Sequence, residues 1–257
     1  MRGTVGSWLL KQPIAHRGYH SGDHACPENS IAACERAIEK EFAIEIDIQS
    51  TADDRLVVFH DDNILRMTGI DGAVRSMEAG RLCSFRLLGS DETIPLLVDV
   101  LELVGDRVPL LIEIKNRGRV GAMERRLLQL LLHYQGRIAV QSFNPFSIRW
   151  FRIHAPRIER GLVSGDFRHE PIAWYRKLIL KHLLLSNICC PHFINYDIQS
   201  LPNRATDRHR RLGISIIGWT ARSMEEYMRA RQLCENVVFE GFDPTEMDRD
   251  GAVPHGT

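Results

Sequence analysis

The chain lacks the features that mark membrane-spanning, secreted and nucleic-acid-binding proteins. Its 33 Lys and Arg balance 33 Asp and Glu, so no overall charge excess points to nucleic acid or an anionic membrane, although local anion sites stay possible. No stretch approaches the roughly 20 apolar residues of a membrane span. The N-terminal apolar run holds only Trp8, Leu9 and Leu10, too short for a signal-peptide core. We expect a soluble, cytoplasmic protein.

Cysteine pairing and metal-type cysteine spacing are also missing. The six cysteines contain no CxxC pair and no zinc-like grouping with histidine, which favours reduced structural thiols. They are Cys26, Cys34, Cys83, Cys189, Cys190 and Cys234. No Gly-rich dinucleotide fingerprint follows the first predicted strand, which disfavours a doubly wound nucleotide-binding sheet.

Short β-branched runs alternate with helical patterns along the whole chain. At 257 residues the sequence fits one large domain, and we predict a single domain over 1–257. Strands are predicted at 13–16, 43–48, 56–60, 110–114, 138–141, 160–163, 192–196, 214–218 and 237–240. Helices are predicted at 30–41, 96–104, 120–134, 145–155, 171–185, 203–211 and 223–233. The nearly continuous apolar strands are typical of a parallel sheet covered by helices.

One connection breaks the alternation. Strands 43–48 and 56–60 are separated by a polar turn around Asp53 and Asp54, too short for a parallel crossover, so they should form an antiparallel hairpin. A turn centred between these two residues would place Asp47 opposite His60. Setting the returning strand aside leaves about eight strands, the number that closes a (β/α)8 TIM barrel.

Two segments stand outside this regular pattern. Residues 61–91 have weak periodicity and several glycines, which indicates a small irregular insertion after the hairpin. The apolar stretch 178–190 is interrupted by Lys181, His182 and Asn187. We favour a buried or half-buried helix there, and the alternative is an interfacial patch near the mouth of the active site.

Three carboxylates occur inside apolar strands. Glu45 and Asp47 lie two residues apart and so share one face of the strand. Buried neighbouring carboxylates repel each other and lose hydration, so they need a cation or must stay protonated. Glu113, near the end of strand 110–114, would complete an oxygen site for Mg2+ or Ca2+. The alternative is a solvated polar face of an edge strand.

Histidines and cations end the same strands. His16 and His60 each end a predicted strand, and such a pair can supply both an acid and a base. A single strand-end histidine is more often structural. Arg17 offers a bidentate fork for phosphate oxygens. Lys115 could meet a substrate phosphate or instead form a salt bridge with Glu45 or Asp47.

Taken together, these residues resemble the glycerophosphodiester phosphodiesterase family, whose signature begins with His-Arg and ends with His-Asp. The matching motifs, in chain order, are His16-Arg17-Gly18, Pro27-Glu28-Asn29-Ser30, Glu45-Ile46-Asp47 and Val57-Val58-Phe59-His60-Asp61. Further matches are Ile112-Glu113-Ile114-Lys115, Gln141-Ser142-Phe143 and Gly218-Trp219-Thr220. The resemblance covers nearly the whole chain in the right order.

The resemblance implies a (β/α)8 barrel that hydrolyses glycerophosphodiesters to sn-glycerol 3-phosphate and an alcohol. It implies His16 and His60 as the acid–base pair, and Glu45, Asp47 and Glu113 as ligands of one divalent cation, Mg2+ or Ca2+ with Mn2+ also possible. The implied partner is a small-molecule substrate and not nucleic acid.

The resemblance also suggests substrate contacts. It places Arg17 and Lys115 near the phosphate, and Glu28 near the metal or the substrate glycerol. Glu28 could instead help to cap the helix that follows it. Phe143 and Trp219 either line the pocket or pack the barrel.

The chain departs from the family at two places. Six residues, 19–24, lengthen the segment before the Pro-Glu-Asn motif, and Glu240 stands where relatives often carry a Thr-Asp-Pro-like ending. Two other functions remain as alternatives. One is a phospholipase D or C type acting on lysolipids or phosphoinositides, with 178–190 holding an acyl chain. The other is a phosphodiester-binding module without turnover.

Overall fold

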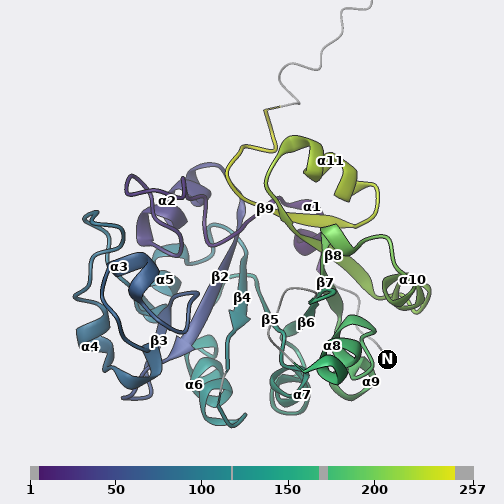
Figure 1. Ribbon diagram of the computed structural model, residues 1–257, viewed down its shortest axis with the longest axis horizontal. Helices are drawn as coiled ribbons and strands as arrows, with labels where there is room; N and C mark the ends of the chain where they lie inside the picture. Colours follow the sequence, from purple (N-terminus) through teal and green to yellow (C-terminus); the bar gives the residue numbers. More distant parts are fainter. Residues whose placement is uncertain (1–5, 117, 168–172, 247–257) are drawn as a thin grey trace, which may run out of the picture.

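Nine strands form one sheet that closes into a barrel (Figure 1). The computed structural model describes residues 6–246 except 117 and 168–172. The strands are β1 (Ile14–Ala15), β2 (Ala43–Ser50), β3 (Leu56–Val58), β4 (Leu110–Ile114), β5 (Ile138–Ser142), β6 (Glu159–Ser164), β7 (Phe193–Asp197), β8 (Ser215–Ala221) and β9 (Asn236–Phe239). Setting aside β3, eight parallel strands follow the order β1-β9-β8-β7-β6-β5-β4-β2, and β1 pairs with both β2 and β9. The predicted TIM barrel is confirmed.

Helices surround the barrel as the strand–helix alternation predicted (Figure 1). They are α1 (Ser7–Lys11), α2 (Ile31–Glu39), α3 (Leu65–Thr68), α4 (Ala79–Leu82), α5 (Leu97–Val104), α6 (Ala122–Leu131), α7 (Pro145–His154), α8 (Trp174–Lys181), α9 (Ser186–Cys189), α10 (Arg204–Arg211) and α11 (Met224–Arg231). Short 3-10 turns lie at η1 (Val74–Ser76) and η2 (Ile198–Ser200). Side-chain caps at Ser30, Asn144, Asn203 and Ser223 begin α2, α7, α10 and α11.

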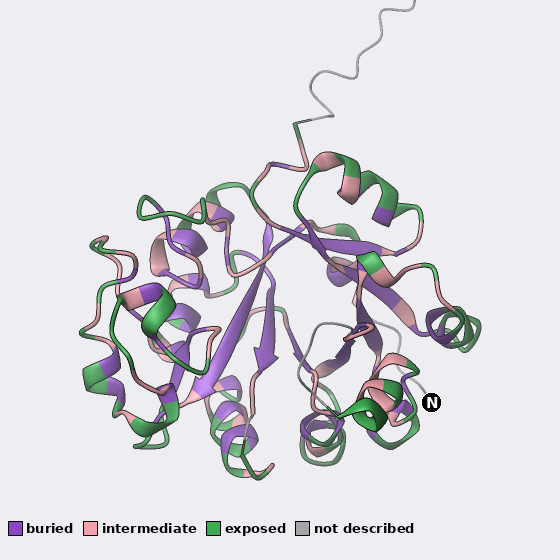
Figure 2. Ribbon diagram, viewed as in Figure 1, coloured by how far each residue is buried: buried purple, intermediate pink, exposed green. Residues whose placement is uncertain are grey.

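Alternation along each strand separates two apolar layers. Ile44, Ile46 and Ile48 pack outward against the helices, where the largest apolar cluster lies. The opposite faces carry Ala43 and Leu111 into a smaller cluster with side chains from other strands, which fills the barrel interior. Because Glu45, Asp47 and Glu113 share the parity of Ala43 and Leu111, their carboxylates also point into the barrel. Figure 2 shows these strands buried along their length.

The antiparallel hairpin forms, but its predicted register is wrong by one residue. Ile48 pairs with Val58, so Asp47 lies opposite Phe59 and not His60. The N–H of Phe59 donates to the Asp47 carbonyl at 2.9 Å. The turn has five residues, 51–55, and its centre is Asp53. The Thr51 hydroxyl accepts from the Arg55 N–H and closes this turn.

The predicted insertion at 61–91 contains α3, η1 and α4. Its apolar side chains, including Ile64, Met67 and Leu82, form a separate cluster with Val57 and Phe59 of the hairpin. The insertion is thereby fixed to the segment that carries His60.

The segment predicted as helix 171–185 differs from expectation. Residues 171 and 172 lie outside the described residues, α8 ends at Lys181, and α9 follows as a separate short helix. Leu183 has φ +54° between the two, which ends α8 and starts a new direction. The stretch 178–190 is half-buried overall, as expected, but none of the residues of α8 is buried.

Candidate active site

A cavity of about 640 Å³ opens at the carboxyl ends of the barrel strands. In parallel (β/α)8 barrels this end collects side chains from successive strands, so residues far apart in sequence meet there. The lining includes His16, Arg17, Asp47, His60, Glu113, Lys115, Phe143 and Trp219, all named from the sequence. Glu45 and Glu28 are not part of the lining.

The three carboxylates form one cluster at the floor of this cavity. Asp47 on β2 pairs in register with Glu113 on β4, and Glu45 lies one step below on the face of Asp47. One oxygen from each acid lies within 4.8 Å of the others, and all three residues are buried. Among the described residues this is the only group of three His, Cys, Asp or Glu side chains close enough to share a metal ion.

Burial and neighbouring charges move the pKa values of Glu45 and Asp47 in opposite directions. The pKa of Glu45 is raised well above its usual value, because burial and the nearby Asp47 and Glu113 disfavour its charge. Burial alone would also raise the pKa of Asp47. The nearby Lys115 and His60 outweigh that effect and hold its pKa below the usual range. Burial thus decides the shift at Glu45, whereas the nearby positive groups decide it at Asp47.

Two cations contact the cluster directly. Lys115 Nζ lies 2.9 Å from Glu113 and 3.3 Å from Asp47, and these acids raise its pKa despite burial. The salt-bridge alternative for Lys115 therefore exists, with Glu113 and Asp47 as its partners. Arg17 lies with Nε 3.4 Å from Asp47 Oδ2, and its backbone N–H donates to Glu45 at 3.1 Å.

Left-handed backbone at Arg17 and Gly18 makes this contact possible. Arg17 has φ +55° and Gly18 has φ +80°. A Cβ at Gly18 would lie 2.8 Å from the backbone of Ala33, so only glycine fits between β1 and α2. Gly18 thus allows the chain after β1 to pack closely against α2.

His16 is held by a carboxylate that the sequence left unassigned. Its Nδ1 lies 2.5 Å from Glu240 Oε2, and the other oxygen of Glu240 accepts from Arg222 at 2.6 Å. The opposite ring nitrogen, Nε2, lies 4.0 Å from Glu45 and therefore faces the carboxylate cluster. Burial lowers the pKa of His16 even against the pull of Glu240, which favours a neutral ring.

His60 has a parallel arrangement. Its Nδ1 lies 2.6 Å from Asp61 Oδ1, and Arg66 of the insertion donates to the other oxygen of Asp61 at 2.5 Å. Burial alone would raise the pKa of Asp61, but the hydrogen bonds from His60 and Arg66 lower it. In both cases the histidine Nδ1 contacts a carboxylate, and an arginine donates to the other oxygen of that carboxylate.

Glu28 joins the two sides of the site. It accepts from Arg17 at 2.7 Å and from both terminal nitrogens of Arg66. The helix that follows is capped by the Ser30 side chain, and Glu28 is engaged with the arginines instead. Asn29, at φ +56°, donates to Asp47 Oδ2 at 3.0 Å and orients that carboxylate.

An aromatic wall lines part of the cavity. Phe143 lies between Trp219 and Phe167, with ring centroids 5.6 and 5.9 Å away. Trp219 also packs on the interior cluster of the barrel and donates to the Ser164 carbonyl, so it serves both roles predicted for it. Leu180 of α8 adds an aliphatic surface to this side.

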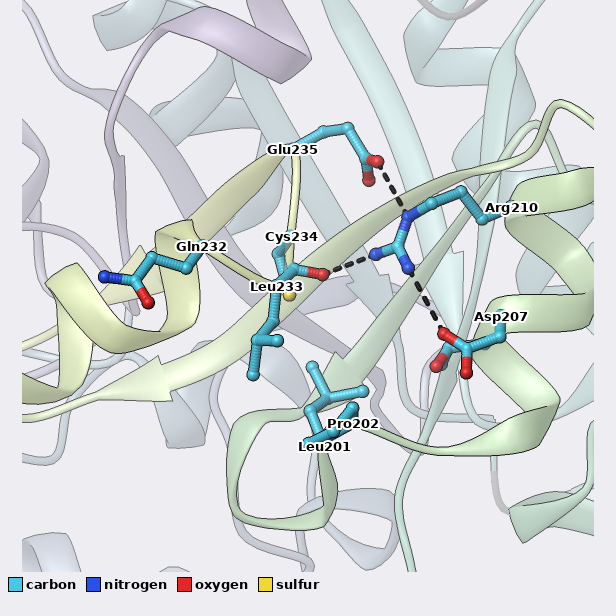
Figure 3. Close-up of a pocket in the computed structure, with 9 residues that line it drawn as sticks. Leu201, Pro202, Asp207, Arg210, Gln232, Leu233, Cys234 and Glu235 are labelled. Carbon is cyan, nitrogen blue, oxygen red and sulfur yellow. Dashed lines mark hydrogen bonds and ion pairs between the residues drawn. The ribbon is translucent and has the colours of Figure 1, made fainter.

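A second cavity of about 280 Å³ lies between α10 and α11 (Figure 3). It shares no lining residue with the larger cavity. Arg210, its main charge, already binds Glu235, Asp207 and the Leu233 carbonyl. This cavity offers no acid–base pair and no carboxylate cluster.

Several residues of the site were missed from the sequence. No local sequence pattern identifies Arg222 or Arg66, the arginines that contact the carboxylates beside His16 and His60. Glu240 was noted only as a departure from the family. His20, in the lengthened segment 19–24, is 4.0 Å from Glu240, and burial lowers its pKa. Asp61 was visible in the His-Asp motif, but its contact with the ring was not.

The donor set fits a hard divalent cation. Carboxylate oxygens are the ligands that Mg2+ and Ca2+ prefer, and a bound cation would offset the burial and the neighbouring acids that raise the pKa of Glu45. Glu45, Asp47 and Glu113 could therefore hold a metal ion at the floor of the cavity.

Comparisons with known proteins agree with this geometry. The model of the glycerophosphoryl diester phosphodiesterase family matches residues 16–239. A glycerophosphodiester phosphodiesterase of Caldanaerobacter subterraneus subsp. tengcongensis is 32% identical over 230 residues, 84% of this chain and 88% of the relative. One from Bacillus altitudinis is 33% identical over 180 residues, 65% of this chain and 72% of the relative.

The fold has solved counterparts as well. An Oleispira antarctica phosphodiesterase in complex with the product sn-glycerol-3-phosphate superposes with a TM-score of 0.78 at 22% identity, covering 95% of this chain and 98% of that one. No helix among the described residues is long and apolar enough to cross a membrane. With the family model and a relative matching most of its length, the chain belongs to the glycerophosphodiester phosphodiesterase family and is a phosphoric diester hydrolase.

Proposed function

We propose that the cavity hydrolyses glycerophosphodiesters to sn-glycerol 3-phosphate and an alcohol, with one divalent cation held by Glu45, Asp47 and Glu113. The observation that carries this proposal is the buried carboxylate cluster beside His16 and His60 in a single cavity. The product bound to the Oleispira antarctica neighbour supports the choice of glycerol phosphate. Mg2+ and Ca2+ suit the oxygen donors, with Mn2+ a further candidate.

The cations of the site bind and orient the phosphate. Glu45, Asp47 and Glu113 would hold a divalent ion, which would supply positive charge to stabilise the phosphoryl oxygens. Arg17 and Lys115 line the same cavity and add fixed positive charge, while Glu28 holds the Arg17 guanidinium in place.

The two histidines move the protons. One accepts a proton from the nucleophile, which is water or the substrate's own glycerol hydroxyl, and the other protonates the departing alcohol. Glu240 and Asp61 bind the Nδ1 atoms, which leaves Nε2 of each ring for the substrate. The Nε2 of His16 faces the cluster, where the phosphate would lie.

The apolar wall favours a second candidate substrate. Phe143, Phe167, Leu180 and Trp219 line one side of the cavity, and a small polar diester needs no such surface. A lysophospholipid would place its acyl chain there, and cleavage would then follow the phospholipase D or C type. Higher turnover of lysophosphatidylcholine than of glycerophosphocholine would establish this substrate.

The direct test is release of glycerol 3-phosphate from glycerophosphocholine, measured with EDTA and then with Mg2+, Ca2+ or Mn2+. We expect EDTA to abolish release and at least one ion to restore it. His16→Ala and His60→Ala should each lower kcat by about 10²–10⁴-fold with an intact fold. His133→Ala, at an exposed histidine just beyond the end of α6, is the matched control and should turn over normally. Near wild-type turnover in either active-site variant would refute the acid–base assignment.

A further inference from the structure

Helix α8 exposes an unusual set of apolar side chains. Five of its eight residues are aromatic or aliphatic, yet none is buried. Trp174 is 73% exposed, and Tyr175 and Leu178 are 49% and 45% exposed. Single exposed apolar residues are ordinary on protein surfaces. A tryptophan, a tyrosine and a leucine within two helical turns form a contiguous patch.

A further exposed aromatic side chain lies on α7, which also begins at the rim of the barrel. Phe146, in the first turn of α7, is 52% exposed, and it follows the cavity residues Phe143 and Asn144. Helix α7 begins just after the carboxyl end of β5, and α8 carries the cavity residue Leu180, so both helices border the end of the barrel where the cavity opens. We call Phe146, Trp174, Tyr175 and Leu178 the rim patch.

The surroundings of the rim patch are basic. Between residues 173 and 192 the chain has no Asp or Glu, whereas Arg176, Lys177 and Lys181 lie on α8. Helix α7 also lacks acids and carries Arg149 and Arg152. Before this segment the sequence has Glu170, and among the described residues Asp166 and Asp197 line the cavity. In a chain with equal numbers of positive and negative residues, this region is a local excess of positive charge.

Helix α8 is anchored on its inner side and faces outward on the other. Its Leu180 lines the cavity, and the Leu180 and Lys181 carbonyls accept from Ser164 and Tyr196. The half-buried residues 179–181 thus tie the helix to the barrel, while Trp174, Tyr175 and Leu178 remain exposed. The same helix therefore joins the cavity wall to the rim patch.

We propose that the rim patch docks on the surface of an anionic phospholipid membrane and brings the mouth of the cavity against the lipid headgroups. Tryptophan and tyrosine favour the membrane–water interface, where the ring is apolar and its polar group stays hydrated. Basic side chains next to an inserted apolar face attract anionic lipids. The short helix lies on the membrane and does not span it.

The charge pattern argues against a second copy as the occupant. In a two-fold dimer the same surface meets itself, so Arg176 and its neighbours would face an identical basic set. Like charges across an interface disfavour association. An anionic surface matches both the apolar and the basic parts of the patch.

Vesicle co-sedimentation tests the proposal without any enzymatic assay, so its outcome is separate from that of the proposed reaction. The full chain is mixed with vesicles of phosphatidylglycerol and phosphatidylcholine, or of phosphatidylcholine alone. We expect binding to the anionic vesicles, weaker binding at high salt, and little binding to the neutral ones. Quenching of tryptophan fluorescence by brominated lipid should accompany binding and fall in Trp174→Phe, which keeps most of the affinity.

Variants separate the apolar and electrostatic contributions. Trp174→Ala should weaken vesicle binding about tenfold or more, and Arg176→Gln about fivefold. The matched controls are Leu132→Ala, an apolar residue 69% exposed just beyond α6, and Arg211→Gln at the end of α10. Both controls should bind as wild type. All four variants should release glycerol 3-phosphate from dissolved glycerophosphocholine at the wild-type rate.

Three results would overturn the proposal. They are equal binding to neutral and anionic vesicles, equal losses in the control variants, and full binding by Trp174→Ala and Arg176→Gln together. Sedimentation velocity without lipid supplies a further check. A dimer that Trp174→Ala dissociates, with vesicle binding unchanged, would assign the patch to a second copy of the chain.

Discussion

Replacing Glu240 by Gln should lower both stability and turnover, because this carboxylate links His16 to Arg222. Burial by itself would raise the pKa of Glu240, but the hydrogen bond from His16, the charge of Arg222 and, at the acidic pH where its ring is protonated, the charge of His16 lower it to about 2. An acid with a lowered folded-state pKa stabilises the protein above its unfolded value. That contribution is lost as the pH falls from about 4.5 toward 2.

The size of the effect follows from the shift. A pKa drop from 4.5 to about 2 corresponds to at most about 3 kcal/mol at neutral pH, and the partial exposure of Glu240 reduces it to about 1–3 kcal/mol. Gln keeps the shape and loses the charge. The free energy of unfolding of Glu240→Gln should therefore fall below wild type at pH 7, and the difference should shrink toward zero near pH 2.

Urea denaturation at a series of pH values measures this difference directly. Glu225→Gln, an exposed acid in the first turn of α11, is the matched control and should show no comparable pH-dependent difference. In the glycerol 3-phosphate assay Glu240→Gln should lose part of the about 10²–10⁴-fold that a positioned acid or base contributes, mostly in kcat. Glu240→Asp should recover some of that loss. A stability difference that stays constant with pH, or wild-type kcat, would refute the reasoning.

Three further predictions concern the core of the site and the thiols. Glu45→Gln should raise the metal-free Tm, because it removes a charge that burial and two neighbouring acids disfavour. It should also abolish any increase in Tm on adding Mg2+ or Ca2+. An unchanged increase in Tm with metal would remove Glu45 from the ligand set. Gly18→Ala should lower the free energy of unfolding by about 1–3 kcal/mol, since its φ is +80° and the new Cβ would meet Ala33; a denaturation midpoint equal to wild type would contradict the close packing. Ellman's reagent should react quickly with Cys83 and Cys190 only, because the other four thiols are buried; more than two fast thiols per native chain would show that the core opens.

Local patterns predicted most of the architecture. All nine strands occur within three residues of their predicted bounds, because apolar runs between polar turns report burial directly. The barrel followed from strand count and from the hairpin at Asp53. The hairpin register did not follow, because the Thr51 side chain fixes a turn that sequence spacing does not reveal.

The site was predicted where residue type and position within one strand suffice. Glu45 and Asp47 share a face at a spacing of two, and their pairing with Glu113 follows from adjacent parallel strands. The contact of His16 with Glu240 joins residues 224 positions apart, and no local pattern encodes it. The break between α8 and α9 depends on a left-handed Leu183, which aliphatic composition gives no reason to expect.

The pairing of His16 with Glu240 spans the seam where the barrel closes. His16 follows the first strand, Glu240 follows the last, and β1 and β9 are hydrogen-bonded neighbours. A chain that has assembled seven strands and not yet docked β9 would lack the support of His16, even with its three acids in place. Recovery of full activity during refolding would therefore report the final joining of the chain's two ends. A variant split or shortened before β9 would acquire its histidine geometry only when the missing strand is supplied.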